Sequence, residues 1–353
     1  MKRILIAPLD WGLGHATRCI PLIRLVEELG MQPVLAGEGR SALLLQQEFP
    51  HLEFIPLPGY RVSYPAKGSM ALHMALAIPS ILKSIRKEHI VLENIIREKQ
   101  LDAVISDNRY GLYSKQVPCI FITHQIYIQT PFGSSLLHRM NERFISRFRE
   151  CWIPDTEGPD NLSGELSHGK GSHGNRYFIG PLSRFRKQKA SAGSGYNLVV
   201  ILSGPEPQRS VLEQKVRKEL EGFQGRALMV LGRTEEETEE HQGKMDIYSH
   251  LGANALEQAL SEAELVLCRS GYSGMMDAAV LGCKCIVVPT PGQTEQEYLS
   301  RYHTSLENVL GKEQAAFDLK KALEEAKNLR GFKIRIPDDS LLRERLKKLS
   351  GLA

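Results

Sequence analysis

A glycine-rich turn near the start of the chain carries a histidine whose position suits proton transfer. Residues 10–18 read Asp-Trp-Gly-Leu-Gly-His-Ala-Thr-Arg and lie between an apolar segment and an amphipathic one. Gly12 and Gly14 have no Cβ, so the backbone can turn sharply and come close to a ligand. A neutral imidazole accepts a proton near neutral pH. We therefore predict that His15 is a general base; the alternative is a histidine that only caps the following helix.

A second group of polar residues follows two other apolar segments. Asp107 comes directly after Ala103–Ser106, and His124 and Gln125 come just after Cys119–Ile122. A carboxylate beside an imidazole orients the ring and stabilises its charged form. We therefore predict that Asp107 pairs with His15. A lone aspartate after a strand more commonly caps a turn, and that alternative stays open.

A third motif suits a diphosphate. Residues 268–277, Cys-Arg-Ser-Gly-Tyr-Ser-Gly-Met-Met-Asp, follow an apolar segment and open a helix. Ser270 and Gly271 can offer a hydroxyl and backbone N–H groups at the helix N-terminus, where an anion is stabilised. Asp277 is then placed to accept hydrogen bonds from a ribose diol. The alternative is that these residues serve only turns and helix caps.

Two further stretches carry polar groups at element ends. Gln293, Gln296 and Glu297 lie in an amide- and carboxylate-rich helix start after Pro289, and this chemistry suits sugar hydroxyls. Arg184, in the sequence Gly-Pro-Leu-Ser-Arg, can pair with phosphate oxygens through both of its terminal nitrogens. A surface arginine on its own is more often only solvated.

These motifs lie at the ends of alternating strands and helices. Short apolar segments that alternate with amphipathic ones are typical of parallel sheets covered by helices on both faces. Ligands of such sheets bind beyond the carboxyl ends of the strands, where the motifs above are found. The expected strands are Arg3–Ala7, Pro33–Ala36, Glu53–Ile55, Ala103–Ser106, Cys119–Thr123, Leu198–Leu202, Ala227–Val230, Met245–Tyr248, Leu265–Cys268 and Cys285–Val288.

The pattern runs through two rounds and predicts two domains. The fold class is α/β, with two doubly wound Rossmann-like domains, 1–181 and 182–353, facing an interdomain cleft. For the last helix, near 339–349, packing back on the first domain is an alternative to packing on the second. A long helix is expected over Met70–Lys99 with a kink or break at Pro79, a long loop over Asp155–Arg176, and a solvated acidic loop over Glu235–Glu240.

Composition excludes several classes of protein. The chain has 353 residues, 42% of them hydrophobic, which allows each of two domains its own core. The net charge of +4 is too small to indicate a nucleic-acid-binding protein. Six cysteines without a C-x-x-C pair suggest reduced thiols in a cytoplasmic protein. No apolar run approaches the ~18 residues of a membrane span, so membrane contact is expected to be at most peripheral, on the inner membrane surface.

In combination, these motifs resemble those of the GT-B-fold glycosyltransferases of family 28, the MurG-like nucleotide-sugar transferases. Gly-Leu-Gly-His15 is similar to the N-terminal loop of the family, and Arg-Ser-Gly271 followed by an acid is similar to its donor motif. The acid is normally Glu but is Asp277 here, and the second of the family's paired glutamines is Glu297. The family's glycine-rich phosphate loop is replaced by Ser203-Gly204-Pro-Glu.

The resemblance implies an inverting, metal-independent transfer of a GlcNAc-like sugar from a UDP-sugar donor to an acceptor hydroxyl. His15 is the base and Asp107 its partner. No cofactor is expected, and the absence of a D-x-D carboxylate pair argues against a metal ion. The expected donor-binding residues are Gly14, Arg184, Ser203, Gly204, Leu251, Arg269, Ser270, Gly271, Asp277, Gln293, Gln296 and Glu297. The expected acceptor-side residues are Gly12, Asn108, His124 and Gln125.

Other functions stay open at this point. The sequence from Gly12 to Arg18 is also similar to that of nucleotide-sugar hydrolases, in which water replaces the acceptor hydroxyl. A non-catalytic nucleotide-binding protein would keep the donor motif and not use His15. A nicotinamide dinucleotide enzyme would be expected to have glycine where Thr17 stands, although Glu38 could serve as its ribose-binding acid. The acceptor is not indicated; it is a lipid-linked sugar, a glycan or a small metabolite.

Overall fold

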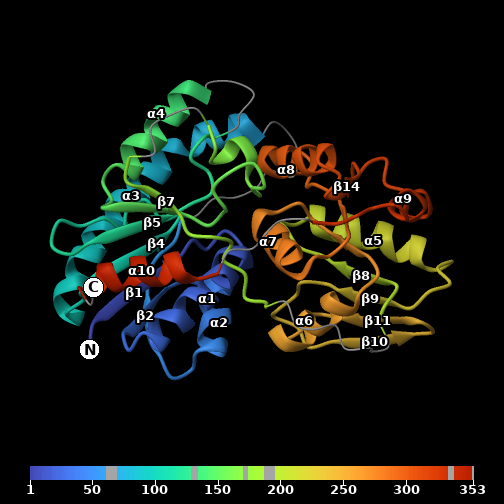
Figure 1. Ribbon diagram of the computed structural model, residues 1–353, viewed down its shortest axis with the longest axis horizontal. Coiled ribbons are helices and arrows are strands. Elements are labelled where there is room, and N and C mark those ends of the chain that lie inside the picture. The colour runs from blue at the N-terminus through green and yellow to red at the C-terminus, as the bar shows by residue number, and fades with distance from the viewer. Residues whose placement is uncertain (61–69, 129–133, 170–173, 187–194, 333–337, 352–353) are drawn as a thin grey trace. The chain divides into compact units, whose positions relative to one another are not determined.

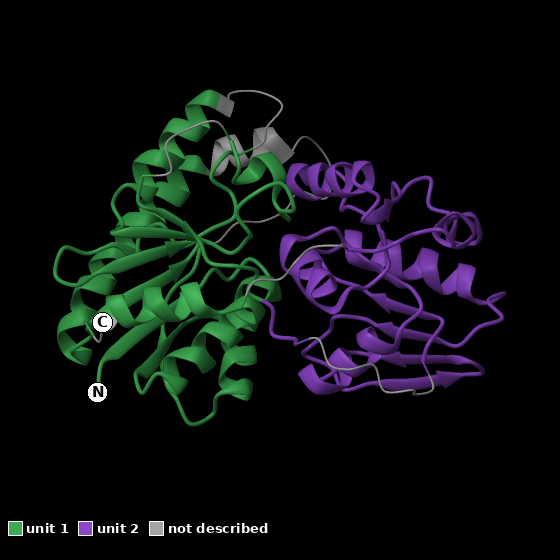
Figure 2. Cartoon of the chain, in the orientation of Figure 1, with its two compact units in different colours: residues 1–65, 69–182, 336–353 green, residues 66–68, 183–335 purple. Residues whose placement is uncertain are grey.

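The computed structural model describes residues 1–60, 70–128, 134–169, 174–186, 195–332 and 338–351. The chain forms two compact units (Figure 2). Unit 1 comprises Met1–Pro65, Ser69–Leu182 and Ile336–Ala353, and unit 2 comprises Ala66–Gly68 and Ser183–Arg335. Each unit has its own sheet, so each is described by itself.

Unit 1 is built on a seven-stranded sheet. Its strands are β1 (Arg3–Pro8), β2 (Gln32–Gly37), β3 (Glu53–Pro56), β4 (Ala103–Asp107), β5 (Cys119–Ile122), β6 (Glu150–Ile153) and β7 (Arg176–Phe178). They are all parallel, in the order β3-β2-β1-β4-β5-β6-β7. Strand β1 reads Arg-Ile-Leu-Ile-Ala-Pro and is buried on both faces, as the inner strand of a parallel sheet must be.

Helices cover both faces of this sheet (Figure 1). They are α1 (Leu13–Glu28), α2 (Gly39–Glu48), α3 (Met70–Lys99), α4 (Ser134–Ile145) and α10 (Ser340–Ser350). Side chains of a strand alternate between faces. Ile4 and Ile6 therefore share a core with α1 and with Leu346 of α10, whereas Leu5 and Ala7 share a core with α3.

Unit 2 repeats the architecture. Its strands are β8 (Leu198–Ile201), β9 (Ala227–Val230), β10 (Glu239–Gln242), β11 (Met245–Tyr248), β12 (Val266–Cys268), β13 (Cys285–Val287) and β14 (Val309–Gly311). Their order is β10-β11-β9-β8-β12-β13-β14, and only β10 is antiparallel to its neighbour. The helices are α5 (Gln208–Leu220), α6 (Ala253–Glu262), α7 (Tyr272–Leu281), α8 (Thr294–Ser305) and α9 (Leu319–Ala326).

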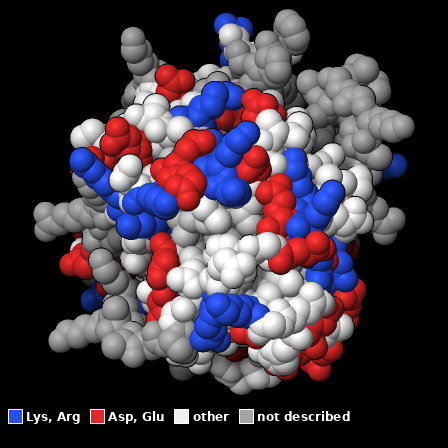
Figure 3. Space-filling view, turned by 90° about the vertical axis from the view of Figure 1, so that its right-hand side faces the viewer, with Lys and Arg blue, Asp and Glu red and all other residues white. Residues whose placement is uncertain are grey.

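The surface of unit 2 mixes charges of both signs. In Figure 3 basic and acidic side chains alternate across the visible face and do not gather into a patch of one sign. Charged side chains of unit 2 also form ion pairs, such as Arg217 with Glu213 and Lys312 with Glu325. This face therefore lacks the single-sign surface by which proteins hold a nucleic-acid backbone.

The predicted fold class, two doubly wound α/β domains, is confirmed, with local corrections. Strands β6, β7 and β14 and helix α2 were not predicted, and residues 239–242 of the expected acidic loop form the edge strand β10. Helix α3 runs through Pro79 without a break. Within the described segments, none of the helices has the length and apolar character needed to span a bilayer.

Candidate active site

The edge of the unit 1 sheet where β1 and β4 end brings His15 and Asp107 together. The strand order reverses between these neighbours, and such a reversal point is where parallel sheets bind ligands. Pro8 pairs with Asp107 in register, and the N–H of Leu9 donates to the carbonyl of Asp107 at 2.9 Å. Because α1 begins directly after this point, His15 in its first turn lies above the end of β4.

The His15 ring contacts the carboxylate that was predicted as its partner. Nδ1 of His15 lies 3.1 Å from Oδ1 of Asp107. The Asp107 side chain is fully buried and that of His15 is 18% exposed. Because Nδ1 faces Asp107, Nε2 is the nitrogen left for a substrate. The geometry fits a base with its orienting acid.

Arg18 completes this cluster and was not predicted as part of it. Its Nε donates to Oδ2 of Asp107 at 2.6 Å, and its Nη2 donates to Oδ1. The same Nη2 lies 2.9 Å from Nδ1 of His15, and Nη1 lies 3.2 Å from Nδ1 of His124. The signal that could have found it is spacing, because positions three apart share one face of a helix.

Burial and charge set the protonation states of the pair. Burial lowers the pKa of His15, and the positive charge of Arg18 lowers this pKa further, against the opposing effect of Asp107. Burial alone would raise the pKa of Asp107, but the charges of Arg18 and His15 outweigh it and hold that pKa well below its usual range. At neutral pH the site therefore contains an ionised aspartate and a neutral histidine.

The expected acceptor-side residues surround the same sheet edge. Gly12 precedes α1 with φ of 116°, a conformation that favours glycine, and its carbonyl accepts from the Ser41 hydroxyl at 3.1 Å. Asn108 also has a positive φ, 60°. His124 is buried next to Arg18, and the carbonyl of Gln125 accepts from the Asn141 amide. The carbonyl of Gly14, an expected donor contact, accepts from the hydroxyl of Thr17.

A second buried ion pair holds the loops of this edge in place. Nε of Arg109 lies 2.5 Å from Oε1 of Glu88 on α3, and both side chains are almost completely buried. Oε2 of Glu88 accepts from the Tyr60 hydroxyl and from the N–H of Gly111. Arg109 also donates to the carbonyls of Pro8 and Pro58. The pair therefore ties α3 to the chain segments that follow β1, β3 and β4. No sequence motif indicated it.

In unit 2 the corresponding reversal lies between β8 and β12, and helix N-termini gather at that edge. Helices α5, α7 and α8 begin after β8, β12 and β13, which are consecutive in the sheet. Gly204 follows β8 with φ of 102°, and a Cβ on it would lie 3.4 Å from the Thr290 hydroxyl. Gly271 is the N-cap of α7. Their backbone N–H groups and helix fields suit an anion.

Asp277, another predicted donor residue, lies on α7 and contacts Ser183, the neighbour of Arg184. The Ser183 hydroxyl donates to Oδ1 of Asp277 at 2.6 Å, and the guanidinium of Arg184 stacks on the ring of Phe185. Burial raises the pKa of Asp277 to about 6, although the charge of Arg184 and the hydrogen bond from Ser183 oppose this rise. Asp277 therefore titrates close to neutral pH.

Four of the predicted donor contacts are made to the protein itself in this structure. The buried Arg269 donates to the carbonyls of Gln208, Val288 and Pro289. It therefore joins its own loop to the segments that follow β8 and β13. The Ser270 hydroxyl is fully buried and donates to the carbonyl of Gln296. The side-chain oxygens of Gln296 and Glu297 accept from the N–H groups of Thr290 and Gly292. These hydrogen bonds fix the shape of the loops, and the contacts of the four residues with a donor stay predictions.

The remaining predicted donor residues lie at the ends of other elements of the unit. Ser203 is exposed after β8, and Leu251 is half-buried two residues before α6. Gln293 is the N-cap residue of α8, and its side-chain oxygen is buried without a hydrogen-bond partner.

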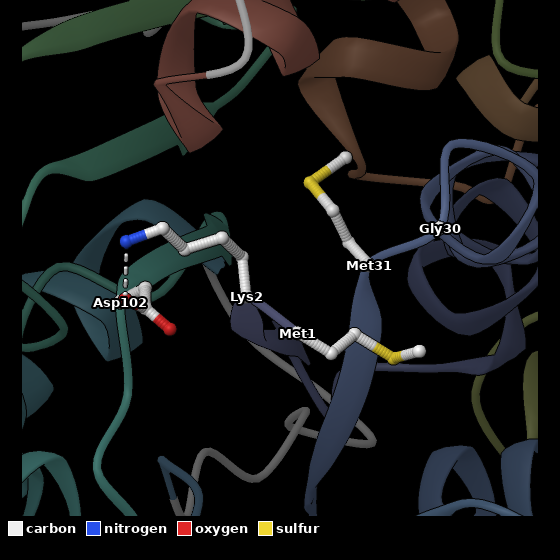
Figure 4. Close-up of a pocket in the computed structure, with 5 residues that line it drawn as sticks. All are labelled: Met1, Lys2, Gly30, Met31 and Asp102. Carbon is white, nitrogen blue, oxygen red and sulfur yellow. Dashed lines mark hydrogen bonds and ion pairs between the residues drawn. The ribbon is translucent and has the colours of Figure 1, made fainter.

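A shallow cavity lies elsewhere in unit 1. It has a volume of about 390 Å³ and lies at the amino ends of β1 and β2 (Figure 4). Lys2 and Asp102 in its wall pair with each other at 2.8 Å, so their charges balance. This is the opposite end of the strands from His15, and we assign it no part in the site. Among the described residues, no three His, Cys, Asp or Glu side chains are grouped so that they could hold a metal ion.

Comparison with known proteins identifies a family for part of the chain and a fold for nearly all of it. Residues 198–328 match the model of the glycosyltransferase family 28 C-terminal domain. No curated protein sequence matches the chain. This match covers β8 to α9, and so includes the loops that carry Gly204 and Gly271 and helix α7 with Asp277.

Solved structures cover nearly the whole chain at low identity. The spinosyn rhamnosyltransferase SpnG has a TM-score of 0.64 at 15% identity, covering 99% of this chain and 95% of its own. The glycosyltransferase SnogD from Streptomyces nogalater has a TM-score of 0.61 at 15% identity, covering 99% of each. MurG from Acinetobacter baumannii has a TM-score of 0.57 at 12% identity, covering 100% of this chain and 96% of its own. Residues 198–328 therefore match a family 28 glycosyltransferase domain, and the chain as a whole shares the fold of these solved glycosyltransferases.

Proposed function

We propose that the chain is an inverting glycosyltransferase that moves a sugar from a UDP-sugar to an acceptor hydroxyl, with His15 as the base. The observation that carries the proposal is the contact of His15 Nδ1 with Asp107 at 3.1 Å. It leaves Nε2 of a neutral ring to take the proton. The expected transferred sugar is GlcNAc-like, and the expected acceptor is a lipid-linked sugar or a glycan. We expect a cytoplasmic protein with at most peripheral membrane contact.

The reaction is a single displacement at the anomeric carbon. The acceptor oxygen forms the new bond to that carbon while the bond to the diphosphate breaks. The acceptor proton passes to Nε2 of His15, and Asp107 stabilises the imidazolium that results. The nucleoside diphosphate leaves with the bonding electrons, and the N-terminus of α7 together with Arg184 offsets its charge. The proposed mechanism needs no metal ion.

Gly271 supports the placement of the diphosphate. Its φ of −72° is open to any residue, and a Cβ there would meet only the Gln296 amide nitrogen, at 3.9 Å. The fold itself therefore does not require glycine at this position. Close approach of a ligand to the backbone gives a reason for it.

The nucleotide is the part of the proposal that a simple measurement decides. SpnG has been solved with thymidine diphosphate, so a deoxynucleotide is the competing donor class. We expect UDP and UDP-GlcNAc to raise the melting temperature, and GDP-mannose, thymidine diphosphate and NADH to raise it less. At a hundredfold excess over Kd, a ligand adds about 3 kcal/mol to the free energy of unfolding.

Gly271→Ala is the matched variant for this measurement. A methyl group there leaves the fold intact, with a loss of about 1 kcal/mol or less from the changed helix cap. It should abolish most of the stabilisation by UDP because it lies where the diphosphate would approach. If UDP stabilises the variant and the wild type equally, the diphosphate does not bind at the N-terminus of this helix. An unresponsive wild type would withdraw the donor assignment.

The affinity for a nucleotide sugar should depend on Asp277 protonation. This carboxyl has a pKa of about 6, above its unfolded value, so its ionisation opposes folding as pH rises through 6. An ionised carboxylate accepts both hydrogen bonds of a ribose diol, whereas the protonated form accepts less well. We therefore expect the affinity for UDP-GlcNAc, measured by calorimetry, to fall from pH 7 to pH 5. Asp277→Asn should bind weakly at both pH values, and an unchanged pH dependence in this variant would exclude Asp277.

A further inference from the structure

One guanidinium organises the charged groups around His15. Arg18 is 2% exposed and donates to both oxygens of Asp107, through Nε to Oδ2 at 2.6 Å and through Nη2 to Oδ1. Two parallel hydrogen bonds between Arg and a carboxylate form the strongest kind of side-chain pair. The Sγ of Cys19 also lies 3.6 Å from Oδ2. Asp107 is therefore bound by donors other than His15.

This arrangement places His15 Nδ1 between a group that only donates and a group that only accepts. Arg18 Nη2 lies 2.9 Å from Nδ1, and Asp107 Oδ1 lies 3.1 Å from it. Arginine has no acceptor and an ionised carboxylate has no donor. Nδ1 therefore either carries a proton for Asp107 or accepts one from Arg18, and a single nitrogen does not do both.

Burial and the charged groups that face the ring act against one another, and their net effect disfavours its charged form. These groups are Arg18 on α1, Asp107 on β4 and His124 after β5. An aspartate alone beside a histidine favours the imidazolium. Here the positive charge of Arg18 lies within hydrogen-bond distance of both, so the attraction from Asp107 is largely offset. The pKa of His15 is lowered, first by burial and then by Arg18.

We propose that Arg18 is a positioning residue of this site, which holds both oxygens of Asp107 and so keeps the His15 ring uncharged and able to accept a proton. This inference rests on the proposed role of His15 as the base. In a simple histidine–aspartate pair, the ring would be partly protonated near neutral pH and unable to act. With Arg18 in place, Asp107 orients the ring without causing its protonation before the acceptor proton arrives.

The first test is the pKa of His15 in the wild-type protein, and the only variant it needs is one that assigns the His15 signal. Full-length protein labelled at its 11 histidines is titrated by NMR, and the His15 signal is assigned by its loss in His15→Gln. We expect His15 to titrate below the ordinary histidine value of about 6.5. A pKa above that value would overturn the proposal, because it would show that Asp107 and not Arg18 dominates.

Three arginine variants then assign the effect. Arg18→Met should raise the pKa of His15 by about one unit or more. Arg18→Lys, which keeps the charge without the two-point contact, should give an intermediate value. Arg24→Met is the matched control, since Arg24 is on the same helix but pairs with Glu48 at the surface, and it should leave the pKa of His15 unchanged. An unmoved His15 in folded Arg18→Met, or an equal shift in Arg24→Met, would contradict the inference.

The titration is independent of the proposed function. If His15→Ala keeps its transfer rate, His15 is not the base, yet the NMR values still report whether Arg18 controls its charge. If His15 is the base, the acidic limb of the pH profile of kcat/KM should move to higher pH in Arg18→Met. The size of this move should equal the rise in the pKa of His15. A rate profile that stays in place while the pKa moves would separate Arg18 from catalysis.

Discussion

Replacement of His15 with alanine is expected to lower kcat for glycosyl transfer by about 10²- to 10⁴-fold, the usual contribution of a positioned general base. The reason is that no other side chain takes over: the only other imidazole facing the cluster, among the described residues, is His124, whose Nδ1 faces Arg18. The measurement is the release of nucleoside diphosphate from whichever donor stabilises the protein in the ligand panel.

The control for this prediction is another histidine of unit 1. His51 is 61% exposed and pairs with Glu27, so His51→Ala should leave the rate unchanged. Stabilisation by UDP should persist in His15→Ala, because the donor loops belong to unit 2. A His15→Ala protein with a wild-type rate would leave a binding protein or a different base as the explanation. Release of free sugar at the full rate without any acceptor would instead identify a hydrolase.

Glu88→Ala is expected to reduce the free energy of unfolding of unit 1 by about 3–5 kcal/mol. The substitution leaves the guanidinium of Arg109 buried without its counter-charge and removes the acceptor of the Tyr60 hydroxyl and of the Gly111 N–H. An unpaired buried charge costs far more than the lost contact alone. The measurement is urea denaturation followed by tryptophan fluorescence.

Tryptophan fluorescence reports on the unfolding of unit 1. The chain has two tryptophans, Trp11 and Trp152, and both lie in unit 1. The matched control is Glu53→Ala, which breaks the partly exposed ion pairs of Glu53 with Arg3 and Lys99 and should cost about 1 kcal/mol or less. Equal losses in the two variants would show that the Glu88–Arg109 pair contributes no more than a surface pair.

The parts of the fold that the sequence predicted are those with strong apolar patterns. Strand β8 reads Leu-Val-Val-Ile and β1 contains Ile-Leu-Ile-Ala, and such apolar runs predict inner strands of a parallel sheet. Strands β7 and β14 have three residues each and lie at sheet edges, too short for a pattern. Strand β10 is fully exposed and charged, and only its pairing with β11 makes it a strand.

The site shows the same division. The contact of His15 with Asp107 follows from strand order, because the polar residues after neighbouring parallel strands share one edge of the sheet. The hydrogen bonds of Ser270, Arg269 and Gln296 do not follow from order or spacing. The direction of a buried side chain is set by the groups packed around it, which come from loops far away in the sequence. For the same reason no role was predicted for Arg18, although it lies in the motif of residues 10–18.

The position of α10 has a consequence for biosynthesis. Leu342 and Leu346 lie in the core of unit 1, although about 150 residues of unit 2 precede them in the chain. Domains generally fold as they leave the ribosome. Part of the apolar face of unit 1 therefore stays uncovered until the residues of α10 have been translated. A nascent or truncated product that stops after unit 2 would expose that face and should depend on chaperones to avoid aggregation.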